Sequence, residues 1–337
     1  MIASTLAATP LPEILLRRRA LKHVTVLGYH RVMPLPGPEY PFNEGMVSVT
    51  PEEFARELKY FRANLDVISM SQLLDGLRDP SRLPPRPAVI TFDDGYRDNF
   101  NYALPLLNEA GLPACFFVCT GLVGTRAIPW YEAWVCCLKQ SRARRIESPF
   151  DGDDAPYDLG PEHWPASFRR FRQRIRNVPW RQMPAQLERL RELTSVNPDD
   201  LLSDPLFMSW DEVRGLASAG MDIGGHTRTH PILSRVEDPV TLRDEIGGCH
   251  GDLAIALGRP PFAFAYPWGH TQAMSADADA EIARAGFQLS FSYMDGFAPR
   301  QVRKAARLPR LHTDFGDNHH AFRLRMATAP DLSSLAG

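Results

Sequence analysis

An apolar run from Pro87 to Phe92 ends in two adjacent acids, Asp93 and Asp94, and this combination restricts what the chain around it can form. The run predicts a buried strand, and the glycine that follows the acids turns the chain. Carboxylates rarely end a buried strand unless another group pairs with them. Adjacent side chains point in different directions, so one carboxylate can bind a metal while its neighbour accepts a proton. Taken alone, the two acids would equally suit a polar turn that caps a helix.

A pair of histidines further along the chain, His226 and His230, supplies matching metal ligands. On a helix this spacing would place both imidazoles on one face, as in zinc proteases. Pro231 disfavours the helical conformation at His230, however, and two glycines precede His226. We therefore predict a strand over Met221–Ile223, followed by a loop that presents both histidines. Two histidines and one carboxylate form an open metal site with positions left for water and substrate.

Several blocks, in this order, resemble the polysaccharide deacetylase family, the NodB-homology group of metal-dependent carbohydrate N-deacetylases. The resemblance extends from about Val24 to about His312. It is carried by TFDDGY at 91–96, MSWDEVRGLASAGMDIGGHT at 208–227, HTRTH at 226–230 and FAYPWG at 264–269. It implies an α/β fold, a distorted (β/α) barrel of the NodB-homology type.

The resemblance also implies a division of labour within the site. Asp94, His226 and His230 would hold a divalent metal ion, zinc in first place, with cobalt, nickel or iron as alternatives. Asp93 would remove a proton from water. The metal and the backbone N–H of Tyr266 would stabilise the tetrahedral oxyanion.

The catalytic acid has two candidates. Conventional family members carry this histidine near the C-terminus, in a Leu-x-His motif. Here the predicted strand Val24–Tyr29 runs into His30, which resembles the circularly permuted, exopolysaccharide-type branch. We assign the acid to His30, which would protonate the departing sugar amine, and keep His312 as the alternative for an unpermuted order. A histidine that only caps a core strand is the remaining interpretation of His30.

An arginine that pairs with the catalytic aspartate is present in the third block of many family members. No arginine lies within 265–270 of this sequence. Arg310, from the last strand, is a candidate, because a guanidinium beside Asp93 would keep it ionised and oriented. A surface location for Arg310 is an equal alternative.

Strand-like and helix-like segments alternate along the chain, which predicts a parallel sheet with helices outside it. His30, Asp93, His226 and Tyr266 each follow a predicted strand, where such barrels place their active sites. The deacetylase barrel is expected over 23–315, between an N-terminal extension at 1–22 and a C-terminal tail at 316–337.

A basic helical insertion, at about 124–205, interrupts this alternation. We favour a solvated cap whose arginines pair with local acids. The alternative is a lid that holds a phosphate-bearing or lipid-linked sugar, or that contacts an anionic membrane surface peripherally.

Composition and charge exclude some classes of partner. The net charge of −2 gives no case for nucleic acid binding. No apolar run approaches the ~18 residues of a transmembrane helix, and the N-terminus lacks a secretory signal pattern. The five cysteines are an odd number and include a vicinal pair, so we expect reduced thiols and a cytoplasmic protein.

The predicted function is removal of N-acetyl groups from an N-acetylhexosamine-containing glycan or glycolipid precursor, with release of acetate. The alternative is an amidohydrolase of the same site type that opens a cyclic amide or removes a formyl group from a non-sugar amide. A non-catalytic carbohydrate-binding module is disfavoured because the ligands and Asp93 are all present. Trp130, Trp268 and Tyr29 are candidates for stacking on a sugar ring, although each equally suits core packing.

Overall fold

Parallel strands close into a barrel in the computed structural model, which describes residues 9–302, 306–312 and 319–332. Parallel pairing of β1 with β5, from Thr25 opposite Ala88 to Tyr29 opposite Phe92, completes the ring. The predicted (β/α) barrel is therefore confirmed. Around the barrel the order is β1 (His23–Tyr29), β13 (Leu308–His312), β11 (Leu289–Asp295), β10 (Ala263–Ala265), β9 (Asp222–Gly225), β6 (Cys115–Val118) and β5 (Pro87–Phe92).

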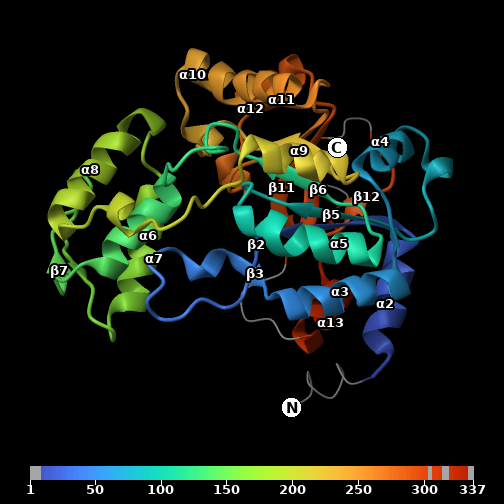
Figure 1. Cartoon of the computed structure of the whole chain (residues 1–337), viewed down its shortest axis with the longest axis horizontal. Helices are drawn as coiled ribbons and strands as arrows, with labels where there is room; N and C mark the ends of the chain where they lie inside the picture. Colours follow the sequence, from blue (N-terminus) through green and yellow to red (C-terminus); the bar gives the residue numbers. More distant parts are fainter. Residues whose placement is uncertain (1–8, 303–305, 313–318, 333–337) are drawn as a thin grey trace.

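Helices cover the outside of the barrel (Figure 1). The helix α3 begins as its sequence predicts, because the Thr50 side chain accepts a hydrogen bond from the Glu53 N–H at 3.3 Å and Pro51 occupies the first position. The covering helices are α3 (Pro51–Asn64), α4 (Met70–Arg78), α5 (Leu104–Ala110), α9 (Trp210–Ser218), α10 (Pro239–Arg243), α11 (Cys249–Leu257) and α12 (Ala276–Ala285). Short strands add to this frame: β2 (Arg31–Val32), β3 (Val47–Val49), β4 (Asp66–Val67) and β12 (Ala298–Pro299).

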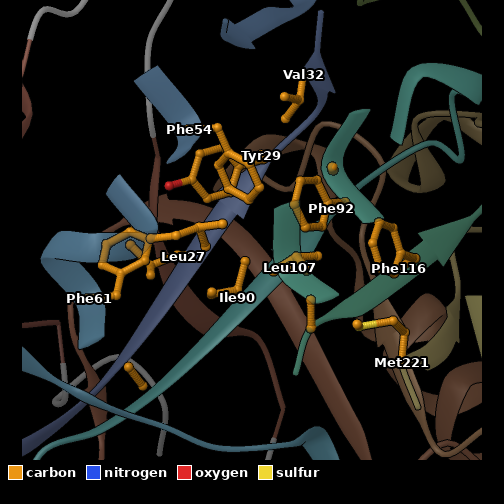
Figure 2. Close-up of a cluster of buried hydrophobic side chains, with 14 of the residues drawn as sticks. Leu27, Tyr29, Val32, Phe54, Phe61, Ile90, Phe92, Leu107, Phe116 and Met221 are labelled. Carbon is orange, nitrogen blue, oxygen red and sulfur yellow. The ribbon is translucent and has the colours of Figure 1, made fainter. Parts of the chain in front are cut away.

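The strands are buried on both faces, which explains their continuous apolar runs. Ile90 and Phe92 of β5 face the outer helices, and Phe92 stacks on Phe116 with ring centroids 4.6 Å apart (Figure 2). Val89, the neighbour of Ile90, belongs instead to a second buried cluster with Phe117. Burial on both faces leaves the strand ends as the place where polar side chains reach solvent.

The N-terminal extension and the C-terminal segment pack together against the barrel. The helices are α2 (Leu11–Ala20) and α13 (His319–Thr328), and Leu16 and Phe322 join the same buried cluster. Glu13 and Arg323 form an ion pair at 2.6 Å between the two helices. The predicted boundary at residue 315 lies outside the described residues.

The insertion forms a helical body on one side of the barrel (Figure 1). Trp134 and Phe171 stack at its centre, with centroids 5.2 Å apart. It comprises α6 (Trp130–Gln140), α7 (Trp164–Ile175), α8 (Met183–Thr194) and a small hairpin of β7 (Arg145–Ile146) and β8 (Tyr157–Asp158). Among the described residues, no helix is both long and apolar enough to cross a membrane.

Candidate active site

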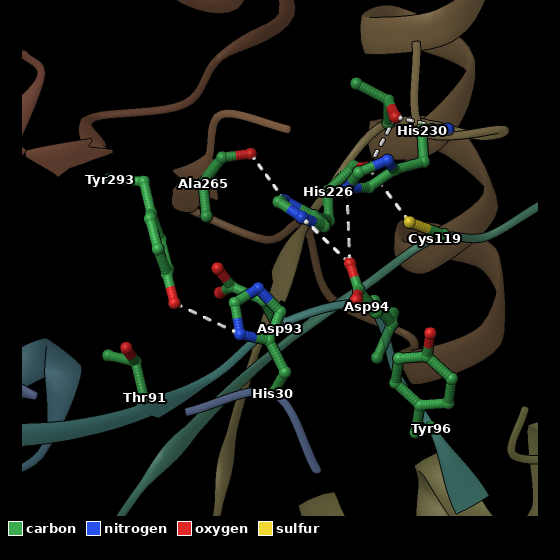
Figure 3. A network of polar contacts seen from close by, with 12 residues as sticks. His30, Thr91, Asp93, Asp94, Tyr96, Cys119, His226, His230, Ala265 and Tyr293 are labelled. Carbon is green, nitrogen blue, oxygen red and sulfur yellow. Dashed lines mark hydrogen bonds and ion pairs between the residues drawn. The ribbon is translucent and has the colours of Figure 1, made fainter. Parts of the chain in front are cut away.

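Five of the predicted site residues gather at the carboxyl ends of the barrel strands (Figure 3), namely His30, Asp93, Asp94, His226 and His230. His30 follows β1, the Asp93–Asp94 pair follows β5, and His226 follows β9. The carboxyl ends of parallel strands meet at one rim of a barrel, so residues far apart in sequence become neighbours there. The expectation that the histidine pair lies on a loop is also confirmed, because β9 ends at Gly225 and no helix contains His230.

Asp94, His226 and His230 form a buried cluster whose ligand atoms all lie within 4.8 Å of one another. The Nε2 atoms of His226 and His230 lie 3.3 and 3.2 Å from Asp94 Oδ1. The Nδ1 atom of His226 is 2.7 Å from the Ala265 carbonyl oxygen, and this contact favours the tautomer that leaves Nε2 free for a metal.

These residues fit a divalent cation. In the described part of the chain, neither oxygen of Asp94 has a hydrogen-bond donor, although both are buried. A buried carboxylate without such partners is costly unless a cation compensates it. Burial opposes ionisation of Asp94, but His230 and His226 outweigh it, so the pKa of Asp94 lies below its ordinary value. An ionised carboxylate and two imidazoles are the donor set that zinc and similar metals accept.

The histidine loop has a backbone that needs external support. Thr227 and His230 adopt φ values of 66° and 64°, in the left-handed region that residues with side chains rarely occupy. Buried Glu245 accepts hydrogen bonds from the backbone N–H groups of Arg228 and Thr229, both at 2.9 Å. Glu245 is a positioning residue that sequence reasoning missed, since no local pattern connects it with the loop.

Asp93 forms a buried, two-pronged ion pair with Arg310. Each carboxylate oxygen accepts a hydrogen bond from a different guanidinium nitrogen at 2.7 Å. The carbonyl oxygen of Ser292 and the hydroxyl of Thr91 hold the same guanidinium at 2.9 and 3.1 Å. Burial would raise the pKa of Asp93, but Arg310 and His226 outweigh it and lower the pKa. The pairing prediction for Arg310 is confirmed, and its surface alternative is wrong.

His30 follows β1, His312 ends the neighbouring strand β13, and Tyr293 of β11 contacts both histidines. His30 lines the active-site cavity, and its Nδ1 atom lies 3.2 Å from the Tyr293 hydroxyl. The His312 ring stacks on the Tyr293 ring, with centroids 3.4 Å apart, and is buried. Burial, followed by the charge of Arg310, holds the pKa of His312 well below its ordinary value. Of the two candidates, His30 is the one that the geometry presents to a substrate.

Tyr266 is not brought into the site. Its backbone N–H donates to the Phe291 carbonyl oxygen at 2.9 Å, and its hydroxyl donates to Asp279. Trp268, two residues further along, lines the cavity with a left-handed φ of 60°. Among the described residues, no backbone acceptor contacts the backbone N–H of Trp268, which makes this group the better candidate for an oxyanion donor. The strand pairing of Tyr266 is a tertiary contact that the local sequence does not reveal.

A cavity of about 350 Å³ lies over these residues. The barrel supplies His30, Asp93 and the two histidines, and the insertion supplies one wall. Such a volume is within the usual range for small-molecule sites. The residues from the insertion that line it are Tyr131, Trp134, Phe168 and Arg172.

Of the three aromatic candidates for sugar stacking, Trp268 is the one that lines the cavity. Tyr29 is buried in the core and donates to Glu57 at 2.5 Å. Trp130 is buried, stacks on Trp268 with centroids 5.6 Å apart, and donates to the His230 carbonyl oxygen at 2.9 Å. Trp130 therefore supports the histidine loop.

A parallel barrel with a candidate metal cluster and a paired aspartate at its strand ends defines a (β/α)-barrel enzyme. The model of the polysaccharide deacetylase family matches residues 81–290, and the chain belongs to this family of hydrolytic deacetylases. The matched region contains Asp93, Asp94 and the two histidines. It contains neither His30 nor Arg310, so the roles of these two residues depend on the geometry and on the resemblance described above.

Solved structures of deacetylases share the fold. The Streptococcus pyogenes deacetylase PplD in complex with acetate has a TM-score of 0.60 and 16% sequence identity, covering 90% of this chain and 98% of that chain. IcaB from Ammonifex degensii has a TM-score of 0.56 and 17% identity, covering 91% and 98%. A de-N-acetylase from Aggregatibacter actinomycetemcomitans has a TM-score of 0.56 and 15% identity, covering 90% and 100%. Among curated proteins, no match to this sequence was found.

Proposed function

We propose that this protein hydrolyses the N-acetyl group of an N-acetylhexosamine in a glycan or glycolipid precursor, with a divalent metal ion, zinc in first place. The observation that carries the proposal is the adjacency of two different carboxylate environments. Asp94 lies in a buried cluster with two imidazoles, where no hydrogen-bond donor among the described residues reaches its oxygens, and Asp93 is held ionised by Arg310 beside the same cavity. The first environment suits a metal ligand and the second a general base.

Asp94, His226 and His230 would hold the metal, which supplies Lewis acidity to polarise the acetyl carbonyl and to acidify water at the site. Asp93 accepts the proton of the attacking water, since each of its oxygens keeps a lone pair beyond the one that Arg310 uses. The backbone N–H of Trp268 donates to the oxygen of the acetyl carbonyl as negative charge develops there.

His30 protonates the leaving amine. In its imidazolium form Nδ1–H donates to the Tyr293 hydroxyl, which leaves Nε2–H for the substrate nitrogen. The C–N bond breaks as the amine gains this proton, and the oxygen of water remains in acetate. An amine leaves poorly without a proton, so His30 and Asp93 need opposite protonation states at the start of turnover.

Acetate release is the direct test. The metal-loaded protein is incubated with tetra-N-acetylchitotetraose, and acetate and free amine are measured together, with Asp93→Asn as the inactive control. We expect equal amounts of acetate and amine. Formate release from an N-formyl sugar, or ring opening of a cyclic amide, without acetate from any N-acetylated sugar would favour the alternative amidohydrolase.

The lipid carrier of the sugar and the cellular location of the protein are further parts of this proposal. Cosedimentation with phosphatidylglycerol vesicles tests whether the insertion contacts an anionic membrane, as a glycolipid substrate would require. The five cysteines are all buried and free, which supports our proposal of a cytoplasmic location.

A further inference from the structure

The wall that the insertion adds to the active site is positively charged. Arg172 of α7 lines the active-site cavity, and Arg176, which follows α7 directly, lines a smaller pocket of about 60 Å³ beside it. His270 and Trp268 line both spaces, so the two adjoin. Arg235 completes the basic lining of the smaller pocket.

Several other arginines of the insertion have acidic partners. Arg170 and Arg174 lie 3.5 and 3.6 Å from Asp153, and Arg189 lies 3.3 Å from Asp151. This part of the insertion therefore matches the solvated cap that the sequence favours.

Arg172 and Arg176 are not neutralised in this way. Among the described residues, no carboxylate lies within ion-pair distance of either guanidinium. The guanidinium carbon of Arg176 lies 5.3 Å from the centroid of the Trp268 ring. Partial burial and the neighbouring charge of Arg172 lower the pKa of Arg176. Two like charges are thus held close together at the cavity.

The helix dipole does not account for this arrangement. Cations are favoured in the last turn of a helix, where Arg172 and Arg174 both lie, whereas Arg176 follows the helix. The dipole also gives no reason for the side chains to line the substrate cavity. Among the residues that line the two spaces, Asp93 is the one acid, and Arg310 already neutralises it.

We propose that Arg172 and Arg176, assisted by His270, form a subsite for an oxyanion carried by the substrate, so that the enzyme prefers acidic glycans over neutral ones. This inference rests on the proposed deacetylase function. A carboxylate of a uronic acid and a phosphate ester share the required chemistry, because guanidinium groups bind both through paired, charge-assisted hydrogen bonds. The bound oxyanion would orient the N-acetyl group of the same or the adjacent sugar towards Asp93.

The test compares matched acidic and neutral substrates. The kcat/KM for acetate release is measured for a hyaluronan tetrasaccharide against tetra-N-acetylchitotetraose, and for N-acetylglucosamine 6-phosphate against N-acetylglucosamine. We expect the acidic member of at least one pair to be preferred at low salt. A preference in the first pair identifies a carboxylate as the ligand of the subsite, and a preference in the second pair identifies a phosphate. Equal kcat/KM within both pairs would overturn the inference but would leave the proposed deacetylase function unaffected.

Variants of the two arginines test whether these residues cause the preference for acidic substrates. Arg172→Ala and Arg176→Ala should each lower kcat/KM for the preferred acidic substrate by about tenfold and leave the neutral substrate nearly unchanged, as loss of a charge-assisted hydrogen bond predicts. Arg172→Lys should keep part of the preference, since it keeps the charge. Arg169→Ala, an exposed arginine of α7 that lines neither space, is the matched control. Equal losses on acidic and neutral substrates would mean a structural role.

Binding separates this inference from the proposed function if no substrate is turned over. Calorimetric titration of the metal-loaded protein with N-acetylglucosamine 6-phosphate, and with glucuronate, is repeated on the Arg172→Ala/Arg176→Ala double variant. Tighter binding of either anion to the wild type supports the subsite, because the metal cluster is the same in both proteins. Identical binding to both proteins contradicts it.

Discussion

The hydroxyl of Tyr293 lies 3.2 Å from Nδ1 of His30, at the wall of the active-site cavity. The opposite neighbour of Tyr293 is His312, whose ring stacks on it. Tyr293 therefore contacts both histidines that compete for the role of catalytic acid, with His30 at the cavity and His312 buried. This arrangement leads directly to a test of the assignment.

His30→Ala should reduce turnover of N-acetyl amides by about 10²-fold or more, because the amine then leaves without a proton. Hydrolysis of an activated acetyl ester, whose leaving group needs no proton, should change little. The alkaline limb of the rate–pH profile should also disappear. Steady-state rates on both substrates give the answer. If His312→Ala instead lost amide turnover selectively, the role would pass to His312 and the unpermuted order would be favoured.

Asp93→Asn should keep metal binding near the wild-type level while lowering turnover by at least ~10²-fold. It should also destabilise the protein by about 3 kcal/mol, because a buried guanidinium loses its counter-charge. The double variant Asp93→Asn/Arg310→Met should regain stability but not activity. Metal content, acetate release and denaturant unfolding are measured on the wild type, on both of these variants and on Asp94→Asn. Loss of metal equal to that of Asp94→Asn would show that the two aspartates are exchanged.

Removal of metal should abolish activity, and zinc or cobalt should restore it. Asp94→Asn and His230→Ala should weaken metal binding, because each removes one of the three donors that meet in the buried cluster. Metal content is determined by elemental analysis after dialysis, and acetate release is followed in parallel. Full occupancy and full activity in either variant would contradict the ligand assignment.

Glu245→Ala should weaken metal binding by about 10–100-fold, although Glu245 is not a ligand, because the left-handed loop that carries His230 loses its support. Competition with a chelator measures the metal affinity. Asp211→Ala removes an exposed carboxylate from α9 and serves as the matched control. An unchanged affinity in Glu245→Ala would mean that the loop holds its shape unaided.

His312 should make folding stability depend on pH. Its pKa in the folded protein lies well below the ordinary value of 6.5, so below that pH the unfolded chain binds a proton that the folded protein does not. Stability from the neutral imidazole is thus complete above pH 6.5 and declines as pH falls, by up to about 1.4 kcal/mol per pH unit. His312→Gln should reduce this slope, as measured by denaturant unfolding at several pH values. Equal slopes would argue that His312 titrates normally.

The elements that the sequence predicts correctly depend on local information. The strand predicted over Val24–Tyr29 runs from His23 to Tyr29 in the structure, and α3 begins with the N-cap that Thr50 and Pro51 favour. The sequence also indicates Asp93, Asp94 and the histidine pair, because each belongs to an unusual local pattern. One pattern is an apolar run that ends in acids, and the other is a histidine pair between glycines and a proline. Backbone preference and burial act over such short distances, so a single sequence carries them.

The contacts that complete the site come from strand order and barrel closure. Arg310 reaches Asp93 across 217 positions because β13 and β5 both neighbour β1. The same closure brings His30 and His312 to one Tyr293. The backbone N–H of Tyr266 is used in pairing with Phe291 of β11, so Trp268 is the better candidate for the role that the sequence predicted for Tyr266. Each of these outcomes depends on which strands lie side by side and in what register, and those are properties of the closed barrel, which no short stretch of sequence contains.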